Sequence, residues 1–211
     1  KGIEKFSKVL MPVLVALSLG IAIYTLTLPG AGAGVKYYFM PDFDKFSVMT
    51  VLAALGQLFY SLSISMGILI TYGSYMPKNT SIEKSVHQIE LFDSGIAIVA
   101  GLMIVPSVFV FTGGNEDMLQ AVAGLMFEML PRIFSTIPLG NIIGVVFFLL
   151  VFFAALTSSI SLMETVVSII QDKVHIKRTT TCLIVVAGCT LFALPSTLGF
   201  GLWENIKIFG L

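Results

Sequence analysis

The stretch GQLFYSLSISMG, residues 56–67, lies inside a long apolar run and places three serines two residues apart, at Ser61, Ser63 and Ser65. On an α-helix, side chains two positions apart point to nearly opposite faces, so these hydroxyls cannot form one polar stripe. A continuous helix accommodates them if each hydroxyl bonds back to a carbonyl of the preceding turn. A broken helix accommodates them if an extended strand from Ser61 to Gly67 joins two half-helices.

The broken helix has a chemical consequence. In hydrocarbon an unsatisfied backbone group is costly, so a break survives only where the freed groups line a cavity in the protein. Freed carbonyls and hydroxyls supply oxygen ligands for an ion, and broken helices with ion sites near the bilayer midplane are typical of secondary transporters. On the local pattern alone, the continuous and the broken helix both remain open.

The composition is that of a polytopic membrane protein. Of the 211 residues, 56% are hydrophobic and 11% are charged, with a mean hydropathy of +0.97, whereas a soluble domain has about 25% charged residues. Five intervals carry no charge, and each is long enough for a spanning helix. We therefore predict an all-α integral membrane fold, one membrane domain over residues 1–211, with spans at 9–28, 48–75, 84–112, 142–170 and 180–198.

Two connections carry patterns of their own. Residues 115–141 are predicted to form an extracellular loop with short helices, because apolar residues recur there at helical spacing. The helix is expected to end at Pro131, and its apolar positions are Leu119, Val122, Met126, Met129 and Leu130. GAGAG, residues 30–34, lacks the Gly-Lys-Ser/Thr ending of a phosphate-binding loop and is interpreted as an outer loop.

Lysine and arginine set the predicted orientation. One side of the membrane collects Lys1, Lys5, Lys8, Lys78, Lys84, Lys173, Lys177 and Arg178, and the other collects Lys36, Lys45, Arg132 and Lys207. By the positive-inside rule the first group is cytoplasmic, so the N-terminal end is predicted inside the cell and the C-terminal end outside. The chain begins at Lys1 with no signal-peptide pattern, and we expect it to be part of a longer protein.

Asp93 is a second anomaly. If its helix begins near Lys84, the carboxyl lies about 13 Å along that helix. A carboxylate inside a membrane is costly, is usually functional and needs a cation or a proton. The alternative is a helix that starts later and leaves Asp93 at the cytoplasmic surface beside Glu90.

A cluster of hydroxyls lies in the fourth span, within ALTSSIS, residues 155–161. The hydroxyl-bearing residues are Thr157, Ser158, Ser159 and Ser161. Such hydroxyls either join neighbouring helices or act as hard oxygen ligands for a hard cation. Glu164 follows one turn later and is expected to face protein or water. Tyr60 and Met66, which lie in the stretch first quoted, fit either core packing or the wall of a pocket.

Three segments resemble the neurotransmitter:sodium symporter family, in its bacterial amino-acid transporter branch. GQLFYSLSISMGILITYGSYM, residues 56–76, is similar to the family's helix 6; FFAALTSSISLMETV, residues 152–166, is similar to its helix 8; and IPLGNIIGVVFFLL, residues 137–150, is similar to the approach to helix 8. The resemblance covers essentially the whole chain. It implies the LeuT-type inverted-repeat fold, with this chain supplying helices 5 to 9 and a broken helix 6.

The resemblance implies two sodium sites. The first would use the Ser61 hydroxyl and Asp93, where many members of the family carry an amide. Chloride-dependent members bind an anion nearby, and Gln57 and Ser61 match two of its ligands. Because Asp93 supplies a fixed negative charge there, the sequence resembles chloride-independent members. The second site matches the carbonyl of Ala154 and the hydroxyls of Thr157 and Ser158.

The resemblance also implies a substrate pocket. Its matching residues are Tyr60, Ser63, Met66, Ser158 and Leu162. Tyr60 occupies the position of an aromatic lid, and Met66 replaces a common aromatic wall with a flexible thioether. Since none of these residues is charged, the expected substrate is a neutral hydrophobic or aromatic amino acid.

Two cytoplasmic features match as well. Asp172 occupies the position of the acidic partner in the inner gate, and Tyr75 matches an aromatic residue that braces that gate. Gly2 and Pro12 match a glycine-to-proline spacing in helix 5. Glycine tolerates unwound geometry and proline removes a helical hydrogen bond, so this end of the first span is expected to unwind.

The functional expectation is sodium-coupled symport by alternating access in a bacterial inner membrane. The partners would be Na⁺, an amino acid, the lipid bilayer and the rest of the transporter chain, which would complete both sodium sites. Proton coupling through Asp93 and a channel or receptor domain are the alternatives. An enzyme is not expected, since the two histidines, His87 and His175, belong to no nucleophile–base pattern. With zero net charge and no basic stripe, the sequence shows no electrostatic feature for binding nucleic acid. Cys182 and Cys189 are interpreted as small apolar residues.

Overall fold

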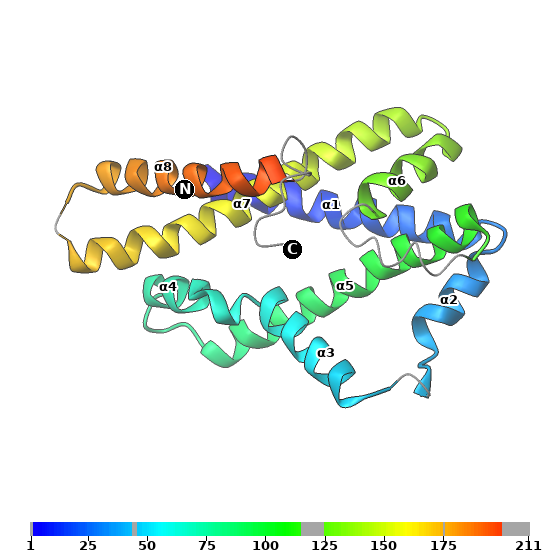
Figure 1. The fold of residues 1–211 in the computed structure, drawn as a ribbon, viewed down its shortest axis with the longest axis horizontal. Coiled ribbons are helices and arrows are strands. Elements are labelled where there is room, and N and C mark those ends of the chain that lie inside the picture. Colours follow the sequence, from blue (N-terminus) through cyan, green and yellow to red (C-terminus); the bar gives the residue numbers. More distant parts are fainter. Residues whose placement is uncertain (1, 44–45, 115–124, 175, 200–211) are drawn as a thin grey trace. The chain divides into compact units, whose positions relative to one another are not determined.

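Figure 1 presents the computed structural model of the chain, which describes residues 2–43, 46–114, 125–174 and 176–199. These residues form helices and the turns between them. The helices are α1 Gly2–Thr27, α2 Ala31–Phe39, α3 Val48–Ser61, α4 Ile68–Tyr75, α5 Ile82–Thr112, α6 Leu125–Thr136, α7 Gly140–Lys173 and α8 Arg178–Gly199. The chain divides into two compact units: Lys1–Ser65 with Pro77–Thr157, and Met66–Met76 with Ser158–Leu211.

Four of the described helices are long and apolar enough to cross a membrane. They are Ser7–Thr27, Ile82–Thr112, Gly140–Lys173 and Arg178–Gly199. The fifth predicted span, residues 48–75, consists of two shorter helices, α3 with 14 residues and α4 with 8. The assignment of all five segments as spans stays a prediction, because length and composition alone support it.

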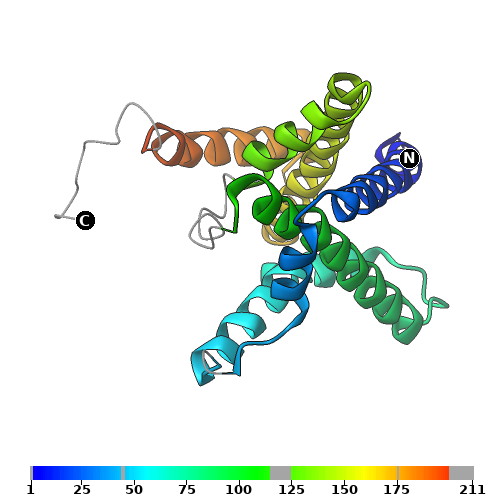
Figure 2. The ribbon, with the colours of Figure 1, turned by 90° about the vertical axis from the view of Figure 1, so that its right-hand side faces the viewer.

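The first unit is built around a core that α1, α5, α6 and the first part of α7 share. Its buried side chains are Ile21, Ala22, Met103, Leu130, Ile133, Phe134 and Phe147. In this unit α1 and α5 lie side by side (Figure 2). The hydroxyl of Tyr24 donates to the carbonyl of Thr136 at 2.9 Å and so ties α1 to the end of α6.

Helix α6 corrects the prediction that Pro131 ends the short helix of the outer loop. The helix continues past Pro131 to Thr136. Proline removes a single helical hydrogen bond, whereas continuing the helix places Ile133 and Phe134, 0% and 5% exposed, in the core. Burial of two large apolar side chains outweighs one lost bond. Leu119 and Val122, which belong to the same predicted pattern, lie outside the described residues.

The GAGAG segment, predicted as an outer loop, is mostly helical: Gly30 is the N-cap of α2, and residues 31–34 form its first turn. Its place on the outer side of the membrane stays a prediction. Glycine is a poor helix former, and here tertiary contact with α5 overrides that preference. A Cβ atom at Gly34 would lie 2.5 Å from the Cα of Pro106, and one at Gly101 would overlap the ring of Tyr38. The two glycines therefore let α2 approach α5 closely, as Figure 2 shows.

Candidate functional site

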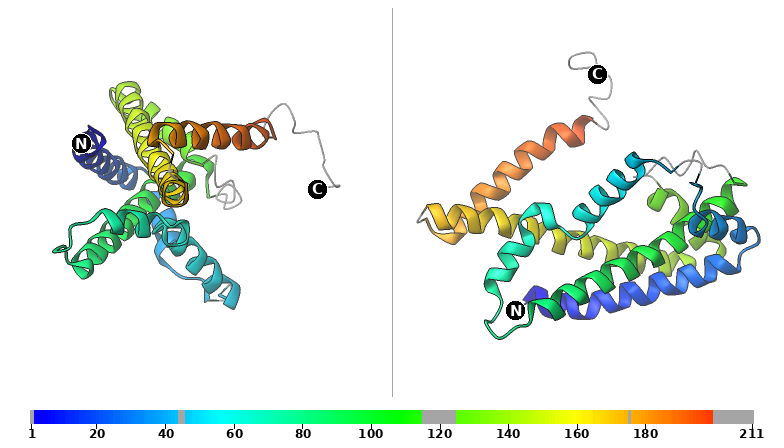
Figure 3. Two further views of the ribbon diagram at one scale, coloured as in Figure 1. Left: turned by 90° about the vertical axis from the view of Figure 1, so that its left-hand side faces the viewer. Right: turned by 90° about the horizontal axis from the view of Figure 1, so that it is seen from below.

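The helix at residues 48–75 is broken between α3 and α4. After Ser61 the chain makes a turn in which the N–H of Ser63 bonds to the carbonyl of Tyr60 at 3.0 Å. A single 3-10 turn follows at Ile64–Met66, and Gly67, with φ 71°, caps the start of α4. Figure 3 shows the interruption of the ribbon. The continuous-helix interpretation is therefore wrong.

The connection is not the extended strand that the serine spacing predicted. Ser63 has φ 55° and Gly67 has φ 71°, both in the left-handed region. An extended segment without a neighbouring strand would leave its N–H and C=O groups unpaired, whereas a compact turn pairs some of them within the chain. A serine with positive φ is uncommon and costs conformational energy, a feature that clusters at functional sites.

The break brings Ser61 to Asp93, the two side chains predicted to form the first sodium site. The Ser61 hydroxyl donates to Asp93 Oδ1 at 2.6 Å, the length of a charge-assisted hydrogen bond from a hydroxyl to a carboxylate. Helix α5 begins at Ile82 and is capped by the side chain of Ser81, so Asp93 lies about 16 Å along it. The alternative that α5 starts later and leaves Asp93 at the helix end is wrong.

This pair of oxygens is suited to a small cation. Among the residues that the structure describes, the neutral hydroxyl of Ser61 is the recorded hydrogen-bond partner of Asp93. A hydroxyl keeps its acceptor lone pairs while it donates, so rotation of Ser61 Oγ would present a lone pair instead of a proton. The carboxylate would then supply the charge and the hydroxyl a second oxygen.

Two of the residues predicted for the second sodium site also meet. The Thr157 hydroxyl donates to the carbonyl of Ala154 at 2.8 Å. Both oxygens lie on α7 within one turn, upstream of Ser158, which is exposed. In a helix this hydroxyl-to-carbonyl bond is a common local arrangement, so the second site stays a prediction.

The residues predicted for the substrate pocket fall into both units. Tyr60, on the last turn of α3, is 65% exposed, and Ser63 belongs to the same unit. Met66, Ser158 and Leu162 belong to the second unit. Ser158 and Leu162 are four residues apart and so share one face of α7.

Three further predicted residues lie apart from these pairs. Gln57 is exposed on α3, one turn before Ser61, and shares its face. Helix α1 is continuous from Gly2 through Pro12 to Thr27. This end of the first span is therefore helical in the structure, and its unwinding at Gly2 and Pro12 stays a prediction.

The second unit holds a charged cluster that the sequence did not identify as a cluster. The hydroxyl of Tyr75 donates to Glu164 Oε1 at 2.9 Å, and Arg178 Nη2 donates to Glu164 Oε2 at 2.6 Å. The Glu164 side chain is 18% exposed and that of Arg178 is 58% exposed. Glu164 was expected to face protein or water, and in the structure it faces protein: its partners lie on α4 and α8. Asp172, the predicted gate carboxylate, is exposed near the end of α7.

One sequence signal pointed toward this cluster. Glu164 is the only charged residue between Arg132 and Asp172, and an acid in a long apolar segment needs a compensating cation. Arg178, fourteen residues further and past a short turn, is a nearby basic side chain that a returning helix brings back alongside α7. The pairing with Tyr75 depends on how α4 packs against α7, which the spacing of residues does not reveal.

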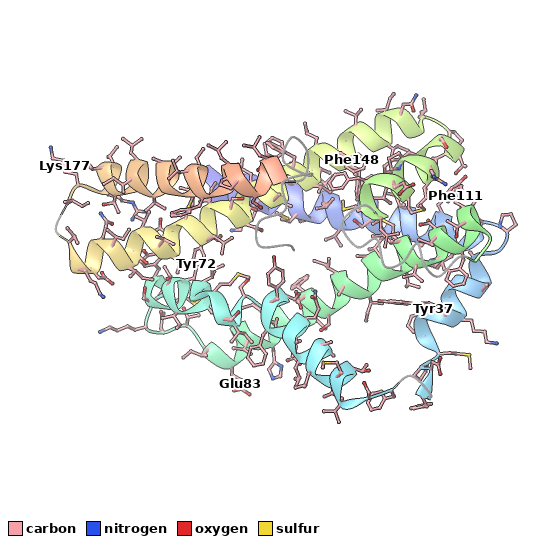
Figure 4. All side chains as sticks on the ribbon, viewed as in Figure 1. Tyr37, Tyr72, Glu83, Phe111, Phe148 and Lys177 are labelled. Atoms are coloured by element: carbon pink, nitrogen blue, oxygen red, sulfur yellow. The ribbon has the colours of Figure 1, made fainter. Side chains whose placement is uncertain are left out.

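A second hydroxyl pair lies beside this cluster. Tyr72 Oη and Ser161 Oγ are 2.9 Å apart, and Tyr72 is labelled in Figure 4. The start of α4 also packs closely on α7, because a Cβ at Gly67 would lie 3.3 Å from Thr165 Cγ2. The sequence analysis assigned Ser161 to the hydroxyl cluster but did not pair it with Tyr72.

A broken helix whose end bonds to a carboxylate on a neighbouring helix, among long apolar helices, is typical of secondary membrane transporters. The "Sodium:neurotransmitter symporter family" profile matches residues 1–204, and the chain belongs to this family. The resemblance to that family is thereby confirmed. The family is one of transporters.

The names of individual similar proteins are consistent with this family. An uncharacterized sodium-dependent transporter of Haemophilus influenzae is 37% identical over 99% of this chain and 45% of its own length. A second uncharacterized sodium-dependent transporter, YhdH of Bacillus subtilis, is 35% identical over 100% of this chain and 46% of its own length. A sodium- and chloride-dependent glycine transporter of Xenopus laevis is 28% identical over 70% of this chain and 19% of its own length. The chain thus spans less than half the length of these relatives.

Among solved structures, the crystal structure of MhsT in complex with L-phenylalanine superimposes with a TM-score of 0.91. It is 40% identical and covers 100% of this chain and 47% of its own. The chain accordingly has the LeuT-type fold, as expected from the sequence.

Proposed function

We propose that this chain is part of a sodium-coupled symporter that carries a neutral hydrophobic or aromatic amino acid by alternating access. The observation that carries the proposal is the carboxylate of Asp93, held at a helix break by a neutral hydroxyl. A carboxylate deep in an apolar helix needs compensation, and a sodium ion supplies it while taking both oxygens as ligands.

The sodium ion has a further effect on the chain in this proposal. By binding Ser61 and Asp93 together, it fixes the end of α3 against α5. Sodium binding would therefore order the broken segment where Ser63 lies, and substrate would bind beside it. The second ion would use Ala154, Thr157 and Ser158, and segments of the transporter outside this chain would complete both sites.

The substrate class follows from the uncharged side chains of the predicted pocket. Tyr60, Met66 and Leu162 are apolar or amphipathic, and Ser63 and Ser158 offer hydroxyls. MhsT, the structural relative at 40% identity, was crystallised with L-phenylalanine, which supports a substrate of this kind. Met66, with a flexible thioether, suits side chains of varied shape.

Alternating access also requires a closed inner side. Tyr75 and Asp172 are proposed to belong to the inner gate, with the basic partner of Asp172 outside this chain. The proposed location is a bacterial inner membrane, with the N-terminal end of this chain cytoplasmic and the C-terminal end extracellular, as the lysine and arginine distribution favours.

The test is binding of tritiated phenylalanine, tryptophan and leucine to the full-length transporter, with sodium replaced by potassium as the control. We expect saturable binding that requires sodium and is unchanged in chloride-free buffer. Strong chloride stimulation would contradict the role of Asp93 as the fixed negative charge. Binding that ignores sodium but depends steeply on pH would instead favour proton uptake by Asp93, and binding of none of the three would contradict the substrate class.

A further inference from the structure

Helix α4 is joined to α7 by two side-chain hydrogen bonds with the same spacing. Tyr72 Oη lies 2.9 Å from Ser161 Oγ, and Tyr75 Oη donates to Glu164 Oε1 at 2.9 Å. The bonded residues are three apart on both helices, so they form consecutive rungs between one face of α4 and one face of α7. The two tyrosine rings meet edge to face, with centroids 6.5 Å apart.

The two rungs differ in strength. The Tyr75 rung ends on a carboxylate whose other oxygen is held by Arg178, and hydrogen bonds to ionised groups are roughly twice as strong as neutral ones. The Tyr72 rung joins two neutral hydroxyls, either of which can donate. The Tyr72 rung is therefore the one that a small change in free energy can make or break.

The weaker bond, between Tyr72 and Ser161, lies between a flexible point of the chain at Gly67 and the predicted binding residue Ser158. Ser161 lies one helical turn after Ser158, which is predicted to bind both sodium and substrate. Helix α4 has eight residues and starts directly after Gly67, whose backbone is left-handed and which offers no side-chain cap. Glycine accepts a wide range of backbone angles, so the chain can pivot at this point.

We propose that Ser161 is a positioning residue of the transport site. Its hydrogen bond to Tyr72 holds α4 against α7 and sets how readily the two helices separate beside Ser158. The inference rests on the proposed function, in which separation of α4 opens the site toward the cytoplasm. Loss of this bond is expected to shift the equilibrium toward separation by about fivefold, the factor that one ordinary neutral hydrogen bond supplies.

The experiment uses Ser161→Ala, Tyr72→Phe and the double variant of the full-length transporter in lipid nanodiscs. Hydrogen exchange of the amides of residues 68–75 is followed by mass spectrometry. Each single variant is expected to raise exchange about fivefold. The effects of the two substitutions are expected to be less than additive in the double variant, because both remove the same bond between the helices.

Two matched variants separate positioning from a general loss of packing. Ser161→Thr keeps the hydroxyl and is expected to restore exchange to the wild-type rate. Ser168→Ala removes a hydroxyl from the same helix whose recorded bond goes to the carbonyl of Thr165 within α7, and exchange in α4 is expected to stay unchanged. Additive effects in the Ser161/Tyr72 double variant, or wild-type exchange in both single variants, would overturn the proposal.

A second readout links the bond to transport. Sodium and substrate are expected to favour the arrangement in which α4 is held, so Ser161→Ala should raise the sodium concentration for half-maximal substrate binding, and Ser168→Ala should not. An unchanged sodium requirement in Ser161→Ala would overturn the positioning role. The exchange measurement needs neither ion nor substrate, so a wild-type protein without sodium-dependent binding would refute the proposed function while leaving the exchange result to decide on the bond.

Discussion

Glu164 and Asp93 are carboxylates well inside two long apolar helices, α7 and α5, and their surroundings differ. Glu164 on α7 has both oxygens engaged, one by Tyr75 and the other by Arg178. Asp93 on α5 has a recorded bond from the hydroxyl of Ser61. One carboxylate therefore has its cation within the chain, whereas the partner recorded for the other, among the described residues, is neutral.

The difference indicates which carboxylate serves structure and which serves an ion. A buried acid whose charge is already balanced gains little from a further cation, while removal of its partner leaves an uncompensated charge. An acid with a neutral partner keeps its attraction for a mobile cation. We therefore propose that Glu164 holds α4, α7 and α8 together, and that Asp93 is the carboxylate of the proposed sodium site.

Neutralisation of Asp93 is expected to have the largest effect. Asp93→Asn keeps the shape and an acceptor for Ser61 but removes the charge that attracts sodium. Opposite unit charges about 4 Å apart at an effective dielectric constant of 20 attract by about 4 kcal/mol, so the sodium concentration for half-maximal binding is expected to rise by at least about 100-fold. Radiolabelled substrate binding titrated with sodium measures it.

Glu164→Gln is the matched control for Asp93→Asn. It neutralises the other carboxylate but keeps an acceptor oxygen for the Tyr75 hydroxyl, so the sodium requirement is expected to rise far less than in Asp93→Asn, by about fivefold at most. Equal loss of sodium affinity in both variants would remove the distinction between the two carboxylates. Asp93→Asn that binds only when chloride is present would sharpen it, since an added anion would then replace the missing charge.

Arg178→Ala tests the other half of the comparison and should act on stability. It leaves Glu164, which is mostly buried, without its cation. Breaking a fully buried pair costs about 3–5 kcal/mol, but the guanidinium is more than half exposed, so we expect about 1–2 kcal/mol. Thermal unfolding in detergent should show a lower midpoint for Arg178→Ala than for Arg178→Ala combined with Glu164→Gln. The reverse order would show that the uncompensated charge is not the cause.

The sequence predicted much of this arrangement. The charge-free intervals located the long helices, and the serines at alternate positions pointed to a broken helix at residues 56–67. The resemblance to the family, and no local pattern, predicts that Ser61 and Asp93 lie together. The predictions of the long helices and of the break succeeded because hydrophobic length and costly polar groups in an apolar segment are properties of local sequence.

What escaped the sequence depends on contacts between segments. The left-handed conformation of Ser63 has no signal in a residue that rarely adopts it. The helix across GAGAG forms because Gly34 and Gly101 permit close packing of α2 on α5, although glycine disfavours helices. The bonds from Tyr75 and Arg178 to Glu164 can be predicted only if the packing of α4 and α8 against α7 is known. In each case tertiary contact overrides or adds to a local preference.

Removal of the Ser61 hydroxyl should have a smaller effect than loss of the Asp93 charge. Ser61→Ala removes one neutral oxygen ligand, and the sodium requirement is expected to rise by about fivefold, the equivalent of about 1 kcal/mol. Ser61→Thr retains the hydroxyl and should stay near wild type. An effect of Ser61→Ala as large as that of Asp93→Asn would mean that the hydroxyl chiefly holds the carboxylate in place, and that the charge alone does not define the site.

The smallest expected effect concerns the strained turn beside the Asp93 site. Ser63→Gly relieves a left-handed backbone, with φ 55°, that costs about 1–2 kcal/mol for a residue with a side chain. Glycine also makes the unfolded chain more flexible, so the net gain is expected to be about 0.5 kcal/mol. Ser65→Gly, which places the same glycine in the neighbouring 3-10 turn at Ile64–Met66, should lower the unfolding midpoint instead.

If Ser63→Gly raises the unfolding midpoint and also weakens substrate binding, the strain at Ser63 serves the transport site, because stability alone would favour glycine there. Unchanged substrate binding would place the role of Ser63 in the turn and remove it from the predicted pocket.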